Sequence, residues 1–156
     1  MFEFEDEQYF DPSDDGYTHL NAYSKGRTHL GRMLSNFAYS PFVFEPYGNF
    51  CSMEGFYYWY VTGKEHQDLR KLHGSTAKVV GQKYERTVHS LTEQDLEIMQ
   101  EAMIAKITQH PEIYDGLKNC TLPIVHYYVS FGRVIQLDKR HDWFAETLEL
   151  IRDALQ

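Results

Sequence analysis

The sequence predicts a single α+β domain that is mainly helical and carries a small antiparallel sheet. Three observations support this fold class. The 156 residues match the usual length of one domain, and their composition, 42% apolar and 24% charged, is that of a globular protein. Several long stretches place apolar residues at helical spacing behind a capping residue. Shorter stretches between turn residues alternate apolar and polar residues or run apolar, which predicts strands.

The chain begins with an acidic, aromatic segment that continues into strands. Residues 1–17 contain seven acids and no lysine or arginine, so we expect an arm outside a domain of residues 18–156. Residues 25–36 contain two glycines and two arginines, which predicts a loop. The strands expected in this half are 18–24, 41–45 and a short return at 50–51.

Capping residues mark the helices. Ser52 precedes a bulky apolar stretch that Gly63 ends, so the helix between them is predicted to be buried. Thr92 and Asp95 resemble a capping box at the start of the longest helix, and Ser75 is expected to cap an earlier one. The expected helices are 53–62, 64–73, 75–84, 93–109, 111–118 and 142–155, with strands at 124–129 and 133–137.

Charge and hydropathy exclude several classes of protein. The net charge of −8 belongs almost wholly to the arm, since the other 139 residues carry 16 acids against 15 bases. No basic stripe follows the chain, which excludes an extended nucleic-acid footprint but leaves room for a pocket that binds one nucleotide. No apolar run is long enough to span a membrane, and the acidic start predicts no signal peptide.

Cysteine and histidine patterns give no metal site or disulfide framework. Cys51 and Cys120 are 69 residues apart, and no histidine pair has the spacing of a zinc site. A reducing cytoplasm is therefore the expected compartment, and no cofactor is expected. The acidic arm can bind a basic partner protein by mimicking nucleic acid, which stays one hypothesis for its role.

Glu54 is the first candidate functional residue. It lies in the first turn of the expected buried helix, beside Phe56, Tyr57 and Tyr58. The helix N-terminus stabilises a carboxylate, whereas burial among aromatic rings raises its pKa. A carboxylate in that balance can orient water or stabilise a developing cation. The same position also suits a glutamate that only compensates the helix dipole.

Four stretches, read in order, resemble the NADAR/YbiA-like superfamily over about residues 18–155. The closing helix with Arg152 agrees with the same pattern. The four stretches are 20–24 (LNAYS), 34–37 (LSNF) leading to 41–42 (PF), 52–57 (SMEGFY) and 99–110 (MQEAMIAKITQH).

The resemblance implies a YbiA-like fold and N-glycosidase activity on a ribose–nitrogen bond. The implied substrate is a small ribosylated nucleotide or ADP-ribose derivative, with an ADP-ribosylated or phosphoribosylated base. Glu54 stands at the position of the functional glutamate, so it is the predicted catalytic carboxylate. Oxocarbenium-like charge at the ribose makes such a carboxylate useful. Members also occur in phage genomes, and a phage-encoded chain would act in the host cytoplasm.

Four further residues are predicted to bind substrate, three of them with a structural alternative. Lys106 lies in the fourth stretch and can bind a phosphate, or extend along the surface as an ordinary lysine. Asn36 can bind a ribose hydroxyl or its own loop backbone. Arg32 can close over a diphosphate or stay solvated, and Lys64 is the lysine nearest to the Glu54 helix.

The chain also departs from the superfamily pattern. Gly55 stands where histidine is usual, and residues 128–132 (YVSFG) replace an element that carries an aspartate. A tryptophan usual before the long helix is absent near Leu91. These departures leave a second hypothesis open, in which the chain is a catalytically inactive module that binds a nucleotide or a protein.

Overall fold

Helix caps read from the sequence set the boundaries of the main helices in the computed structural model, which describes residues 10–136 and 139–156. Ser52 caps α2 (Met53–Val61), and Gly63 follows its end with a φ of 104°. Thr92 and Asp95 form a complete capping box on α4 (Glu93–Gln109). Pro111 begins α5 (Pro111–Asn119), as predicted.

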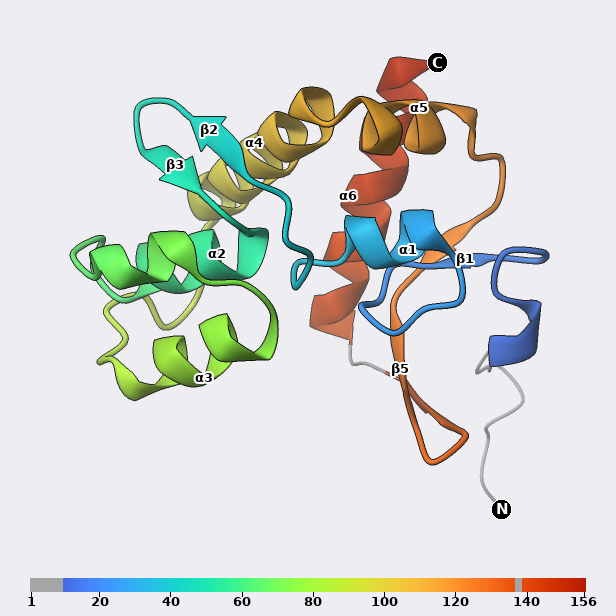
Figure 1. The fold of residues 1–156 in the computed structure, drawn as a ribbon, viewed down its shortest axis with the longest axis horizontal. Helices are drawn as coiled ribbons and strands as arrows, with labels where there is room; N and C mark the ends of the chain where they lie inside the picture. Colours follow the sequence, from blue (N-terminus) through green and yellow to red (C-terminus); the bar gives the residue numbers. More distant parts are fainter. Residues whose placement is uncertain (1–9, 137–138) are drawn as a thin grey trace.

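Three two-stranded pairs form among the described residues (Figure 1). The hairpins β2 (Phe42–Phe44) with β3 (Gly48–Phe50) and β5 (Tyr127–Ser130) with β6 (Arg133–Gln136) are antiparallel, as expected. The third pair joins β1 (Leu20–Asn21) to β4 (Ile124–Val125) in parallel, a pairing that local sequence patterns do not reveal. The α+β class is confirmed, but the strands do not form one sheet.

The prediction of a loop over 25–36 is wrong in part, because this segment contains α1 (His29–Leu34). The side chain of Thr28 accepts a hydrogen bond from the Gly31 N–H and caps the helix. A Cβ at Gly31 would lie 2.4 Å from the Asn21 carbonyl oxygen, so glycine lets α1 approach the end of β1. The residue that suggested a loop therefore serves helix packing.

Other expected elements also have different boundaries. The strand expected over 18–24 covers only Leu20–Asn21, and the one expected over 124–129 is divided into β4 and β5. Residues 64–73 contain a 3-10 helix, η2 (Gln67–Lys71), instead of an α-helix. Helix α3 (Gly74–Lys83) starts at Gly74 with His73 as its N-cap residue, so Ser75 is not the cap. The closing helix α6 (Lys139–Leu155) begins earlier than expected, and Leu137, the predicted end of the last strand, lies outside the described residues.

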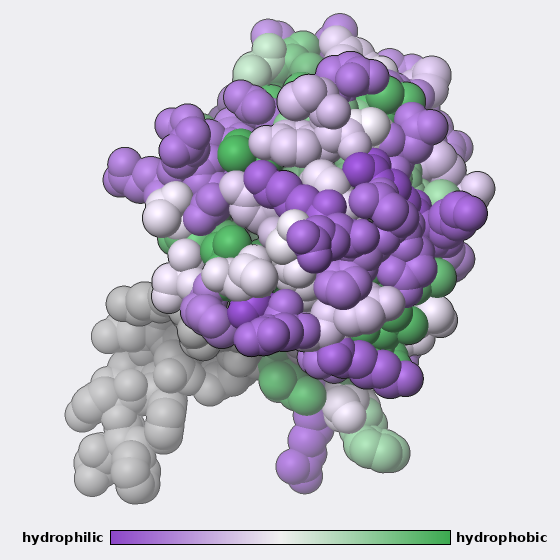
Figure 2. Space-filling model, turned by 90° about the vertical axis from the view of Figure 1, so that its left-hand side faces the viewer, coloured by the Kyte–Doolittle hydropathy of each residue, from purple (hydrophilic) through white to green (hydrophobic). Residues whose placement is uncertain are grey.

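One hydrophobic core contains residues from Leu20 to Ile151, so the described chain forms a single domain. Aromatic side chains of the β2–β3 hairpin and α2 pack together at its centre, for example Phe50 with Phe56 at 5.0 Å between ring centroids. In Figure 1, α2 and α3 lie on one side, and α5, α6 and β1 on the other. Figure 2 shows hydrophilic side chains over most of the α2–α3 side, with hydrophobic ones in small separate groups.

The end of α4 fastens the segment that leads into β2. The Gln109 side chain accepts from Val43 N–H and donates to Val43 C=O, both at 2.8 Å, as a neighbouring strand would. His110 contacts the Pro41 carbonyl oxygen at 2.6 Å. Lys106 donates to the Ser35 carbonyl oxygen at 3.0 Å. Residues 106–110 therefore hold the chain over residues 35–43.

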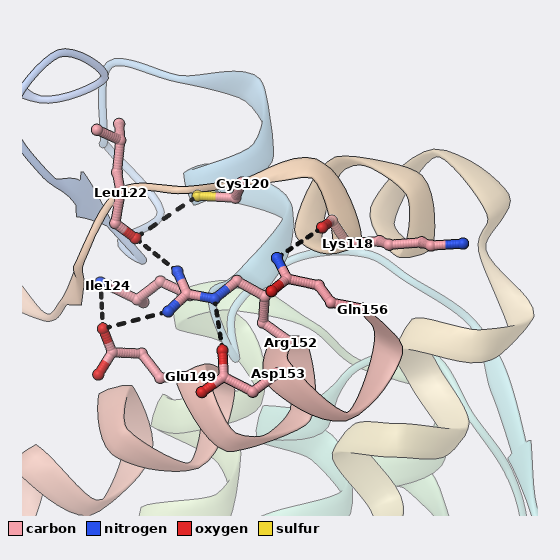
Figure 3. Close-up of polar contacts among 8 residues, drawn as sticks. All are labelled: Lys118, Cys120, Leu122, Ile124, Glu149, Arg152, Asp153 and Gln156. Atoms are coloured by element: carbon pink, nitrogen blue, oxygen red, sulfur yellow. Dashed lines mark hydrogen bonds and ion pairs between the residues drawn. The ribbon is translucent and has the colours of Figure 1, made fainter.

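The closing helix α6 fastens the chain that leads into β4 (Figure 3). Arg152 Nη1 donates to the Leu122 carbonyl oxygen at 2.6 Å, and Glu149 accepts from the Ile124 N–H at 3.0 Å. Arg152 and Glu149 also form an ion pair of 3.8 Å. Together these contacts fix β4, and through it the residues that follow at 126–128.

The described part of the acidic arm packs on the domain. Asp15 is buried, and its carboxylate accepts from the N–H groups of Asn21 and Arg27, each at 2.9 Å. The Phe10 ring stacks on Tyr127 at 5.8 Å between centroids. Asp15 therefore orders the loop after β1, while residues 1–9 of the predicted arm lie outside the described residues.

Candidate functional site

A cavity of about 260 Å³ lies where five parts of the chain meet. The segments after β1 and α1 form one wall, and α2, α3 and the β4–β5 region form the rest. This volume is slightly below the ~300 Å³ at which small-molecule sites usually begin. The lining residues are 23–25 and 35–37, with Glu54, Lys78, His126 and Tyr128.

Backbone contacts place Glu54 at this cavity. Ser52 Oγ accepts from the Gly55 N–H at 3.0 Å and donates to the Leu72 carbonyl oxygen at 2.8 Å, which joins the start of α2 to η2. The Glu54 N–H donates to the Asn36 carbonyl oxygen at 2.9 Å. A Cβ at Gly55 would lie 2.5 Å from the Leu69 carbonyl oxygen, so glycine lets α2 approach the backbone of η2.

Burial raises the pKa of Glu54 to about 7, and the positive charge of Lys78 acts in the opposite direction. The acid and its carboxylate are therefore both populated near neutral pH. Among the described residues that line the cavity, Glu54 is the one acid. A carboxylate with these properties suits proton transfer or stabilisation of positive charge.

Close packing of α2 and α3 brings Lys78 to Glu54. A Cβ at Gly81 would lie 2.2 Å from Tyr58 Cγ, so the Tyr58 ring occupies the space that a side chain at Gly81 would fill. Tyr58 follows Glu54 by four residues, and Gly81 follows Lys78 by three, so each pair shares a helix face. The Tyr58–Gly81 contact thus sets the approach of the lysine to the carboxylate.

Aromatic rings form the opposite wall. The rings of Tyr23 and Tyr128 lie 5.4 Å apart between centroids and tilt by 42°. The His126 ring meets the Tyr128 ring edge-on at 5.4 Å. Burial raises the pKa of Tyr128, and the negative charge of Glu54 raises it further. Tyr128 is therefore a neutral hydroxyl at physiological pH, and it faces the same space as the carboxylate.

No family model, curated protein or solved structure matches the chain. The resemblance to the NADAR/YbiA-like superfamily therefore depends on the four sequence stretches alone. Two of these stretches supply Asn36 and Glu54 to the cavity, and the stretch over 20–24 supplies Tyr23 and Ser24.

Asn36 lines the cavity through a partly buried side chain. Its Oδ1 is buried and has no hydrogen-bond partner among the described residues. A smaller void of about 10 Å³ lies behind it and is also lined by Lys106 and Met53. That volume holds about one water molecule. A buried acceptor without a protein partner beside a void of this size suits one bound water molecule.

Lys106 lies behind the cavity and is not among its lining residues. It is 2% exposed, and burial lowers its pKa to about 7. Its amino group donates to the Ser35 carbonyl oxygen, next to Asn36. Lys106 therefore contacts the loop that carries Asn36 and does not line the cavity itself.

Lys64 and Arg32 also lie apart from the lining. Lys64 has a φ of 64° after α2, and its amino group lies 4.8 Å from the Tyr60 ring centroid. Arg32 Nη1 donates to the carbonyl oxygens of Gly26 and Arg27 at 2.9 and 3.0 Å. Arg32 thus supports the loop that follows the lining residues 23–25.

Sequence reasoning did not select Lys78, Lys25, Tyr23 or Tyr128 as site residues. Lys78 ends residues 74–78 (GSTAK), which resemble part of a phosphate-binding loop. This resemblance was the one signal in the sequence that pointed to Lys78. The described residues contain no cluster of three or more metal-ligating side chains. In the same part of the chain, no helix has the length and apolar character needed to cross a bilayer.

Proposed function

We propose that the chain is an N-glycosidase that hydrolyses a ribose–nitrogen bond in an ADP-ribosylated or phosphoribosylated base. The observation that carries this proposal is the carboxylate of Glu54, with a pKa of about 7, in a cavity that also presents Asn36 and Lys78. The sequence resemblance independently selects the same glutamate.

Glu54 acts on the ribose. Departure of the base leaves positive charge shared between the anomeric carbon and the ring oxygen, and an ionised carboxylate nearby stabilises it. Burial strengthens that interaction, because little water screens it. Water then adds its oxygen to the anomeric carbon, and its proton passes to Glu54 and on to the released base nitrogen. The products are a free ribose hemiacetal and the N–H form of the base.

The other lining residues hold the substrate. Lys25 and Lys78 are the two cations of the lining, and they suit a phosphate of the ribosyl group. The side chain of Asn36, which lines the cavity, suits a ribose hydroxyl. The rings of Tyr23 and Tyr128 offer flat apolar surface to the base.

A second candidate function, binding without turnover, is favoured by one observation. Glycoside hydrolysis usually employs two carboxylates, whereas Glu54 is the one acid among the described lining residues. In this alternative, the cavity binds a ribosyl phosphate and Glu54 accepts a hydrogen bond from it.

Product analysis separates the two functions. The full chain is incubated with ADP-ribosylated guanosine and with a phosphoribosylated aminopyrimidine, and release of base is followed by liquid chromatography and mass spectrometry. A thermal-shift titration with ADP-ribose and ribose 5-phosphate runs in parallel. Release of base supports the N-glycosidase, and stabilisation without release supports the binding module. If neither release nor stabilisation is observed, both functions are contradicted.

A further inference from the structure

A second cavity, of about 820 Å³, is lined in part by α2, the helix that carries Glu54. Tyr57 lines it, and Tyr57 follows Glu54 by three residues on α2, so the two cavities adjoin one face of that helix about one turn apart. The residues after α3, the start of α4 and the start of α6 form its other walls. Its volume lies within the range of ~300–1,000 Å³ that is typical of small-molecule sites.

One side of this second cavity is cationic. The Arg86 guanidinium donates from Nη2 to the Tyr57 hydroxyl at 2.7 Å and from Nε to the Val88 carbonyl oxygen at 2.6 Å. These bonds hold the guanidinium in place and use two of its five N–H groups, which leaves donors suited to a phosphate. No acid is found among the described residues that line the cavity.

The other side is aromatic and aliphatic. Trp143, Leu91 and Leu96 line it, and all three are partly buried. An indole beside aliphatic side chains provides a surface on which a planar base can stack. A held guanidinium and an indole in one cavity therefore match a ligand that joins a planar ring to an anion.

We propose that this second cavity binds a nucleoside phosphate, with the base on the Trp143 side and the phosphate at Arg86. This function goes beyond hydrolysis at Glu54, because binding requires no turnover. The nucleotide can be free, or it can be one part of a longer substrate whose ribose lies at Glu54. Both sources share the chemistry of a base joined to a phosphate.

Tryptophan fluorescence of the full chain, titrated with AMP, tests the proposal. The chain has two tryptophans, and Trp59 is only 4% exposed, so Trp143→Phe assigns the signal. We expect AMP to quench the fluorescence in a saturable way, and adenosine or inorganic phosphate alone to bind more weakly. Equal affinity for adenosine and AMP would overturn the role of Arg86, and absence of AMP binding would overturn the site.

Matched variants locate the binding. Arg86→Gln should weaken AMP binding about tenfold or more through loss of a charged hydrogen-bond donor. Ser90 lines the cavity from an exposed position, so Ser90→Tyr should fill the cavity and weaken AMP binding while Arg86 stays in place. Lys71→Gln, an exposed residue of η2 outside both cavities, is the control and should bind normally. Normal binding by both cavity variants would overturn the proposal.

The Glu54 cavity supplies the last distinction. Trp143 lines the second cavity, so Lys78→Gln should leave the quenching of Trp143 by AMP unchanged. Loss of that quenching in this variant alone would overturn the proposal. Titration with ADP-ribose separates the two sources. If Lys78→Gln and Arg86→Gln both weaken ADP-ribose binding, one ligand spans both cavities. If Arg86→Gln leaves it unchanged, the second cavity takes free nucleotides. Turnover is measured separately, so failure of the N-glycosidase leaves this result interpretable.

Discussion

The backbone N–H of Glu54 donates a hydrogen bond of 2.9 Å to the carbonyl oxygen of Asn36. The bond fixes the start of α2 against the loop after α1, so the two polar side chains that the sequence selected meet at one cavity. Lys106 holds the same loop from behind through the Ser35 carbonyl oxygen. The position of the carboxylate therefore depends on backbone contacts between segments that are distant in the sequence.

Lys78 should control the ionisation of Glu54. Its positive charge lowers the pKa of Glu54, so Lys78→Gln is expected to raise that pKa above its value of about 7. Carboxyl-carbon NMR of glutamate-labelled protein measures the change, with Glu54→Gln to assign the resonance. Lys83→Gln, in the last turn of the same helix, is the matched control. An unchanged pKa in Lys78→Gln would show that the two side chains do not interact.

Lys106 should make the stability of the fold depend on pH. Its pKa is about 7 in the folded chain, against 10.5 for an ordinary lysine. Between these values the unfolded chain binds a proton that the folded chain does not, so the free energy of unfolding rises with pH. Lys106→Met removes this contribution. Urea unfolding at about pH 7 and pH 9 should therefore show the wild type gaining stability relative to the variant.

The difference between wild type and Lys106→Met is the informative quantity, because the other titrating groups are shared by both chains. A difference that stays constant across this pH window would mean that Lys106 is charged in the folded chain at pH 9. That result would contradict the effect of burial on its amino group.

Gly81 should be required for the packing of α3 on α2. Alanine normally favours a helix over glycine, but a Cβ here would lie 2.2 Å from Tyr58 Cγ. We expect Gly81→Ala to lower the free energy of unfolding by about 1–3 kcal/mol. Urea unfolding measures it, with Val79→Ala, an exposed position on the same helix, as the control. A stabilised Gly81→Ala protein would contradict the close contact.

Local signals in the sequence were enough for α2 and α4, each of which begins with a side-chain cap. Ser52 and Thr92 both cap as predicted, because the bond to a backbone N–H three residues ahead needs no distant partner. Helix α1 was missed because its glycine content suggested a loop. The reason for Gly31 is the backbone of Asn21, which the chain reaches only after folding.

Contacts between distant segments also explain why only part of the candidate site could be predicted from the sequence. Glu54 and Asn36 could be selected from their motifs, whereas Lys64 was selected because it is near α2 in the sequence. The amino group of Lys64 lies over the Tyr60 ring, whereas the lysines that line the cavity are Lys78 on α3 and Lys25 after β1. Lys78 is 24 residues after Glu54, and the packing at Gly81 that joins them depends on shape, which no spacing pattern encodes.

Turnover of Glu54→Gln tests the central claim most directly. The variant keeps the size of the side chain and removes a carboxylate whose pKa is raised by burial, so it should be no less stable than the wild type at pH 7. Release of base from an ADP-ribosylated or phosphoribosylated substrate is compared with wild type and with Glu97→Gln, an exposed control on α4. The account predicts folded Glu54→Gln protein with no detectable turnover and normal turnover in the control. Wild-type turnover in Glu54→Gln would contradict it.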